Sequence, residues 1–241
     1  MISNRLCRFF VMFTPLTGVI FLISGAVARS HVAAQGASKT IDLQFVNHIQ
    51  AGMPEQDVLI EKDGKVVRVE GSDPLSTVVQ PVYTTANPIT NDPFKVGANP
   101  LGPFEKGAPL GFTLAQWLGA TGSGTYVVDG NNSQLNLSFK GLVPGGVYTV
   151  WCSRLTFPPN VKVVHEPCGA SDGSQNSFKA ANDGSATFNL TLNALADSTK
   201  ETASIIVVNY HSNGKTYGKN PGDFGQYTHV QIFAMVPVPA S

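Results

Sequence analysis

Apolar and polar residues alternate along much of this chain with the two-residue period of a β-strand. The alternation is clearest over residues 134–155. Leu135, Leu137 and Phe139 share one face there, and the residues between them are polar. After a Pro-Gly-Gly segment, residues 147–154 continue with Tyr, Thr, Val and Trp, which favour strands. Because Pro-Gly-Gly supplies a fixed φ and two positions that tolerate positive φ, we predict a central β-hairpin here.

Short runs of the same kind recur at regular spacing, separated by turns rich in Gly, Asn and Asp. The predicted strands lie in residues 39–47, 57–70, 124–129, 176–181, 185–192, 204–211 and 228–236. Short strands with such turns are typical of two antiparallel sheets packed face to face. We therefore predict an all-β fold, an antiparallel Ig-like or Greek-key sandwich of about seven to nine strands.

One segment, residues 80–112, does not fit the alternating pattern. It holds six prolines and four glycines, and no period survives between them. A long stretch without regular structure is unusual inside a compact domain. Apolar residues along it could still anchor it, so we predict an irregular Pro/Gly-rich arm packed on the sandwich. The anchors are Phe94, Leu101, Phe104 and Leu110.

A short helix is predicted after this arm. Thr113 stands three residues before Gln116, which is the spacing of a capping box. Leu114 and Trp117 form an apolar face, and Gly119 is a typical helix end. A helix of barely two turns depends on packing more than on intrinsic propensity.

The first residues have the pattern of a secretory signal peptide. Arg5 and Arg8 precede the uncharged stretch 9–27, and small residues follow it. We expect cleavage after residue 28 or as late as residue 34; the alternative is a retained membrane anchor. The predicted organisation is a signal peptide at 1–28, N-terminal strands and the arm at 35–112, and the sandwich core at 113–237.

Composition and cysteine content agree with export. Charged residues make up 13% of the chain and the formal net charge is zero, so no basic stripe indicates a nucleic-acid partner. Cys7 leaves with the signal peptide, and Cys152 and Cys168 remain. We predict a disulfide between them, worth about 3 kcal/mol in the chain-entropy model; the alternative is two free thiols.

The strongest candidate for chemistry is a histidine pair near the end of the chain. If residues 204–211 and 228–236 form a symmetric hairpin, His211 lies opposite His229, Asn209 opposite Gln231, and Val207 opposite Phe233. Two imidazoles at that spacing, with Asp223 as a third ligand, could bind copper or zinc. The alternative is a polar pair at a strand end. A register shift of one residue would send the two rings to opposite faces.

Two further patterns are weaker. Residues 169–173 spell G-x-S-x-G, but no helix or βαβ unit follows to place Ser171 as a nucleophile. Tyr148 and Trp151 alternate in face, so one of them is expected in the core and the other on the sheet surface. An exposed aromatic ring on a sheet can be part of a carbohydrate-binding surface, although cross-strand packing is the commoner role.

Several motifs together resemble those of a group of exported bacterial proteins of unknown function. They are Tyr-Thr-Val-Trp at 148–151, Pro-Cys-Gly at 167–169, the stretch 210–218 and Thr-His-Val-Gln at 228–231. The resemblance covers roughly residues 100–236 and implies an exported sandwich, with no activity attached. Copper-zinc superoxide dismutases and cupredoxins are also sandwiches, but this chain lacks the His-x-His strand of the first and the Cys-and-Met ligand spacing of the second.

Together these observations favour an exported, non-enzymatic protein that binds an unknown ligand or protein partner in the periplasm, at the cell surface or outside the cell. The alternative is a copper or zinc protein using the histidine pair, and a weaker alternative is a carbohydrate-binding module. Contact with a membrane is expected only through an uncleaved N-terminal segment, and no nucleic-acid partner is expected.

Overall fold

The computed structural model describes residues 38–47, 51, 58–69, 75–89, 101–157, 159 and 162–237. The predicted signal segment and Phe94 lie outside the described residues. Residues Gln35–Ser241 form one compact unit. None of the helices in the described part of the chain is long and apolar enough to cross a bilayer.

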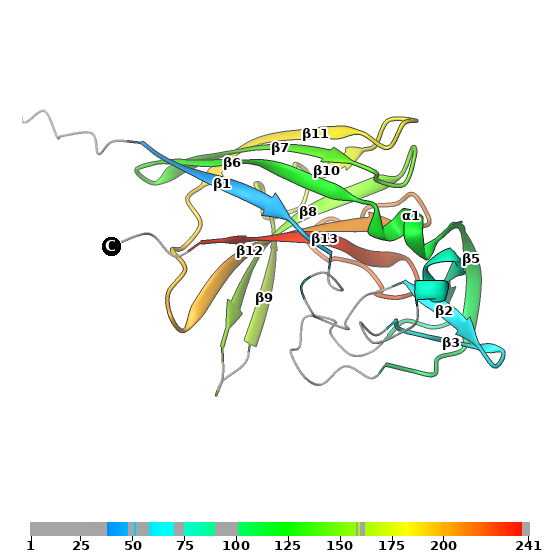
Figure 1. Cartoon of the computed structure of the whole chain (residues 1–241). Helices are drawn as coiled ribbons and strands as arrows, with labels where there is room; N and C mark the ends of the chain where they lie inside the picture. Colours follow the sequence, from blue (N-terminus) through cyan, green and yellow to red (C-terminus); the bar gives the residue numbers. More distant parts are fainter. Residues whose placement is uncertain are drawn as a thin grey trace, which may run out of the picture. The chain divides into compact units, whose positions relative to one another are not determined.

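The predicted all-β sandwich is confirmed. Two antiparallel sheets face each other, and the apolar core fills the space between them (Figure 1). The first sheet has the order β1 (Lys39–Phe45), β6 (Thr121–Asp129), β7 (Asn132–Lys140), β11 (Ala186–Asn193). In the second sheet, β8 (Val147–Thr156) pairs with β12 (Thr202–His211), β12 pairs with β13 (Thr228–Val236), and β9 (Lys162–Pro167) and β10 (Ser177–Lys179) share the other edge of β8.

Alternation along the strands of the first sheet decides which side chains enter the core. Leu135, Leu137 and Phe139 of β7 are buried, as their spacing predicted. Phe139 meets Phe45 of β1 edge to face, with ring centroids 5.3 Å apart. The strand between them, β6, has Gly122 at this level, because a Cβ there would lie 2.6 Å from the Phe139 ring.

The predicted central hairpin is wrong. β7 and β8 lie in different sheets, so the Pro-Gly-Gly segment joins the two layers and does not close a hairpin. Both strands bury apolar faces, which can be satisfied by facing each other across the core as well as by pairing edge to edge. The turn at residues 182–184 likewise carries the chain from β10 in the second sheet to β11 in the first.

The predicted irregular arm is also wrong in part, because it contains two strands of a third sheet. This sheet has the order β3 (Lys65–Val67), β2 (Leu59–Lys62), β4 (Pro81–Thr85), β5 (Lys106–Thr113). The β2–β3 hairpin turns at Asp63 and Gly64 as the sequence predicted, both with positive φ. Pro81 is the first residue of its strand and Pro109 lies on the edge strand, two positions where a missing N–H is tolerated.

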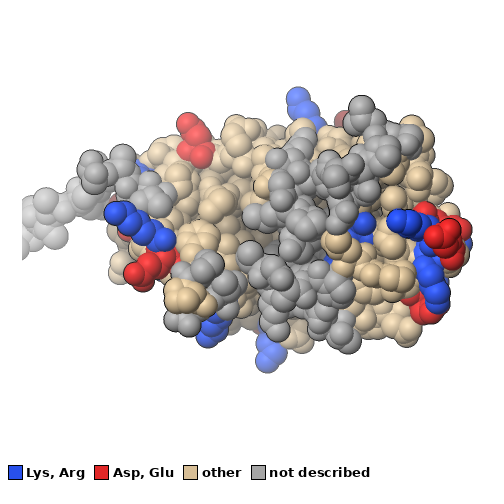
Figure 2. Space-filling view, turned by 60° about the horizontal axis from the view of Figure 1, so that its bottom comes forward, with Lys and Arg blue, Asp and Glu red and all other residues tan. Residues whose placement is uncertain are grey.

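Charged side chains gather at the end of the molecule formed by the third sheet. Figure 2 shows blue and red groups side by side there, at the right end of the view. Lys106 Nζ lies 2.7 Å from Glu61 Oε2, and Lys65 pairs with Glu105. The ion pairs join β5 and the residue before it to the β2–β3 hairpin. Because these side chains are well exposed, each pair adds little stability.

The predicted short helix, α1 (Leu114–Leu118), is confirmed together with its caps. The Thr113 hydroxyl accepts a hydrogen bond from the Gln116 N–H, and the Gln116 side chain accepts one from the Thr113 N–H (2.8 Å). Leu114 and Trp117 are buried. The Trp117 ring stacks on Phe112 of β5 and meets Tyr210 of β12, so α1 links the third sheet to the sandwich.

Candidate functional site

The structure does not pair His211 with His229. The register runs as predicted as far as Val207 opposite Phe233, and then shifts by one residue between Val208 and Asn209. His211 therefore lies opposite Thr228, and His229 opposite Tyr210. Gln231, predicted opposite Asn209, is the extra residue of this β-bulge. The two imidazoles point to opposite faces of the second sheet, which is the outcome of a one-residue register shift.

His211 lies on the outer face, inside a directed chain of hydrogen bonds. Trp151 Nε1 donates to the Thr149 hydroxyl (2.8 Å), which in turn lies 2.8 Å from His211 Nε2. On the other side, His211 Nδ1 lies 3.3 Å from the Thr228 hydroxyl, and that hydroxyl donates to the carbonyl of Pro221 (2.7 Å). Because the Thr228 hydroxyl donates its only proton to Pro221, it accepts from Nδ1; in the neutral imidazole Nε2 is then the acceptor for the Thr149 hydroxyl.

Burial reinforces this neutral state. The His211 side chain is 1% exposed. Burial, and next the positive charge that His229 would carry, lower the pKa of His211 from 6.5 to about 4. The His211 ring therefore links the end of β12 to the loop before β13 through hydrogen bonds. In this neutral form the lone pair of Nε2 accepts the Thr149 hydroxyl.

The other two predicted ligands lie elsewhere. His229 is buried on the inner face, where its ring meets Trp117 and Tyr210. Asp223 is exposed, and its backbone carbonyl accepts the N–H groups of Tyr227 and Thr228. Within the described residues, no three His, Cys, Asp or Glu side chains are grouped so that they could hold a metal ion. The predicted juxtaposition of His211, His229 and Asp223 is thus absent from the described fold.

Tyr148 and Trp151 are both buried, so the prediction that one of them lies on the sheet surface is wrong. Trp151 packs on the outer face of the second sheet under loops that the strand pattern could not reveal. The Tyr148 hydroxyl lies in the core, accepts the Val143 N–H (2.8 Å) and donates to Gln231 Oε1 (2.8 Å). Gln231 Nε2 then donates to the carbonyl of Trp117 (3.2 Å). The bulge residue thereby joins β13, β8 and α1, and burial raises the pKa of Tyr148 above its usual value.

We expect Tyr148→Phe to lower the free energy of unfolding by about 2 kcal/mol. The substitution leaves the Val143 N–H and the Gln231 side-chain oxygen without the hydroxyl that they bond in the core. Guanidinium denaturation measures the loss. Tyr227→Phe is the matched control: the residue is half-buried and its hydroxyl makes no hydrogen bond to the described residues, so its effect should stay within about 0.5 kcal/mol. Equal effects of the two substitutions would contradict the role of the core network.

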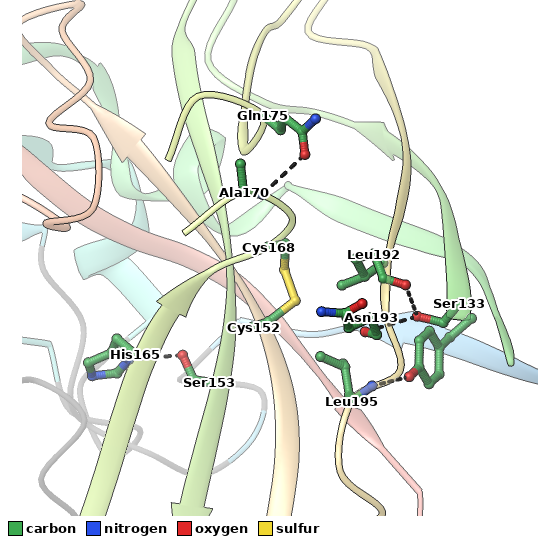
Figure 3. The surroundings of a disulfide bond; sticks show 11 residues. Ser133, Cys152, Ser153, His165, Cys168, Ala170, Gln175, Leu192, Asn193 and Leu195 are labelled. Atoms are coloured by element: carbon green, nitrogen blue, oxygen red, sulfur yellow. Dashed lines mark hydrogen bonds between the residues drawn. A yellow bond between two sulfur atoms is a disulfide. The ribbon is translucent and has the colours of Figure 1, made fainter. Parts of the chain in front are cut away.

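The predicted disulfide is present and joins Cys152 of β8 to Cys168 (Figure 3). Cys168 directly follows the edge strand β9, and its N–H donates to the carbonyl of Val150. Because Cys152 pairs with Glu166, the bond crosses diagonally to the residue two positions further along. Beside it, Ser153 and His165 hydrogen-bond across the same two strands (2.8 Å). The bond therefore fixes an edge strand to the centre of the second sheet.

The outer face of the first sheet is a polar surface with few charged side chains, which we call the polar face. Paired outward residues form three cross-strand rows, and all of them except Val127 and Asp42 carry a hydroxyl or an amide. The rows are Thr40–Val127–Gln134–Thr191, Asp42–Thr125–Asn136–Asn189 and Gln44–Ser123–Ser138–Thr187. In Figure 1 this layer is the upper one, and no labelled element covers it.

A hollow of about 240 Å³ lies at one end of the polar face. Gln44, Ser123 and Ser138 of the third row line it, together with Thr121 and Lys140 from the next cross-strand pair. Amide and hydroxyl groups both donate and accept hydrogen bonds, and the lysine adds donors. The sequence contained this signal, since outward positions in residues 121–140 alternate with apolar ones, but the pairing of four strands was needed to bring the groups together.

Comparison with protein-family models, with curated proteins and with solved structures found no match for this chain. The resemblance to exported bacterial proteins therefore stays a prediction.

Proposed function

We propose that this protein is an exported binding module that recognises a neutral, polyhydroxylated polymer of the cell envelope or its surroundings through the polar face. The observation that carries the proposal is the composition of that face: hydroxyl and amide side chains in register across four strands, with charge almost excluded. Glycans present the complementary chemistry, because each hydroxyl is both a donor and an acceptor.

The way in which the groups are held supports binding by many weak contacts. The rows sit on strands of a sheet, which keep side chains more rigidly than loops do. Each hydrogen bond formed with a ligand replaces a hydrogen bond to water, so it contributes roughly 1 kcal/mol or less to the binding free energy. The three rows contain no aromatic ring for stacking. We therefore expect weak binding of small sugars and stronger retention on a polymer, whose repeated units raise the effective concentration.

The disulfide supports the part of the proposal that concerns export. The Cys152–Cys168 bond is compatible with an oxidising compartment, where such bonds persist. Low charge content and a sheet surface with few charged side chains also suit a protein whose partner is a neutral matrix and not a nucleic acid. Under this proposal the protein holds its ligand without transforming it.

We expect the purified protein to be retained on insoluble polysaccharides in a sedimentation assay with peptidoglycan sacculi, cellulose and chitin. Ser138→Lys should reduce retention at least tenfold, because the longer, charged side chain fills the hollow beside Lys140. Thr216→Lys is the matched control, since it adds the same charge at an exposed position after β12. Retention on none of the polymers, or equal losses in both variants, would refute the proposal.

A further inference from the structure

A second cavity lies away from the polar face, beside the disulfide. Its volume is about 250 Å³, and its wall includes Cys152 and Arg154 of β8 and Glu166 of β9. The end of β11 and the segment after it form the opposite side, including Asn193, which Figure 3 shows next to the disulfide. The cavity therefore opens at the end of the sandwich where the last residues of β11 leave the first sheet.

Arg154 contributes the only cationic side chain of this wall. Its Nη2 donates to the hydroxyl of Thr202 (2.7 Å), whereas Nη1 is buried and has no hydrogen-bond partner. No ion pair joins Arg154 to a carboxylate among the residues that the structure describes. A buried guanidinium nitrogen without an acceptor is costly, because the group loses its hydration and gains nothing in exchange.

The neighbours of Arg154 cannot easily supply that acceptor. The carbonyl of Ala196 already accepts the Ser204 hydroxyl (2.6 Å), and Thr202 directs its single hydroxyl toward Nη2 and Thr199. The backbone N–H groups of Ala194 and Leu195 are donors like the guanidinium, and they donate to the Asn131 carbonyl and the Tyr126 hydroxyl. The Nη1 hydrogens of Arg154 therefore remain without an acceptor among the described residues.

We propose that this cavity is a binding site for a small organic carboxylate, held by the guanidinium of Arg154. A planar guanidinium offers two parallel N–H groups that match the two oxygens of a carboxylate. The volume exceeds that of a single water and accommodates an anion of a few carbon atoms. Cys152 of the disulfide and the aliphatic residues Leu192 and Leu195 line part of the wall and suit its hydrocarbon part.

Glu166 determines the charge that the site accepts. Its carboxylate lines the same cavity and is exposed, so it repels a second negative charge near the opening. The site should therefore prefer a monocarboxylate to a dianion such as inorganic phosphate at neutral pH. Removal of this carboxylate should tighten the binding of every anion.

The test is a titration of the full exported protein with acetate, butyrate and inorganic phosphate at constant ionic strength, followed by two-dimensional amide NMR. We expect saturable shifts at residues 152–154 and 192–196, with butyrate binding more tightly than phosphate. Arg154→Gln should weaken butyrate binding at least tenfold, whereas Lys162→Gln, which removes an exposed cation of β9, should leave it within twofold.

Glu166→Gln keeps the proposal testable if Arg154→Gln does not fold, because an exposed residue tolerates the change. It should tighten butyrate binding about threefold or more and reduce the preference over phosphate. Shifts that do not saturate, phosphate binding tighter than butyrate, or unchanged binding in Glu166→Gln would overturn the proposal. None of these outcomes depends on the polar face, so failure here leaves the proposed function standing.

Discussion

Replacing Cys152 and Cys168 together by alanine lowers the free energy of unfolding by about 3 kcal/mol. The bond closes a loop with a sequence separation of 16 residues, which restricts the unfolded chain. In the folded state it also fixes the edge strand β9, whose other side carries no partner strand in the described sheet. Guanidinium denaturation of the variant and the parent protein measures the loss.

Reduction provides the control for this prediction. Dithiothreitol should destabilise the parent protein by a similar amount and leave the double variant unchanged, because it acts only through the bond. Proteolysis should then cut first near residues 157–162, between β8 and the released strand. A double variant as stable as the parent would show that the sheet alone holds β9.

Acid should destabilise the protein through His211. Its pKa is 6.5 when unfolded and about 4 when folded, so the unfolded chain binds the proton first. Stability is therefore complete above about pH 6.5 and falls as the pH drops toward 4. The two values imply a total loss of about 3 kcal/mol from this one side chain. Thermal unfolding at pH values between 7.5 and 4 measures the slope.

The hydrogen bonds around His211 explain why protonation of its imidazole is unfavourable in the folded protein. A proton on Nε2 would face the Thr149 hydroxyl, which already accepts from Trp151 and donates to that nitrogen. His211→Gln removes the titrating group but keeps a donor and an acceptor. This variant should be less stable at pH 7.5 because its shape differs, yet its stability should fall less between pH 6.5 and 4. An undiminished slope in the variant would assign the acid sensitivity to other groups.

Local signals in the sequence predicted local structure well. The Thr113–Gln116 capping box gave the start of α1, and Asp63-Gly64 gave the turn of the β2–β3 hairpin, because caps and tight turns depend on a few neighbouring residues. Strand β13 was predicted with its observed bounds, 228–236. The Cys152–Cys168 pairing was predicted from expected export and from the two cysteines left after the predicted signal peptide.

Predictions that required the partner of a strand were less reliable. Residues 80–112 were judged by their prolines, but Pro81 begins its strand and Pro109 lies on an edge strand, where a missing N–H is tolerated. The histidine pairing depended on a register that the bulge at Gln231 changes. β12 is buried on both faces, so its apolar run carried no signal against a one-residue shift.

The sequence by itself determined that this chain folds as β-strands with an apolar face each, a capped short helix and one disulfide. Only the tertiary structure decided which strands share a sheet: β7 and β8 face each other across the core, and the outward residues of β1, β6, β7 and β11 merge into one polar face. The physical reason is that alternation records which side of a strand is buried, whereas strand pairing and register are set by packing between segments distant in the chain.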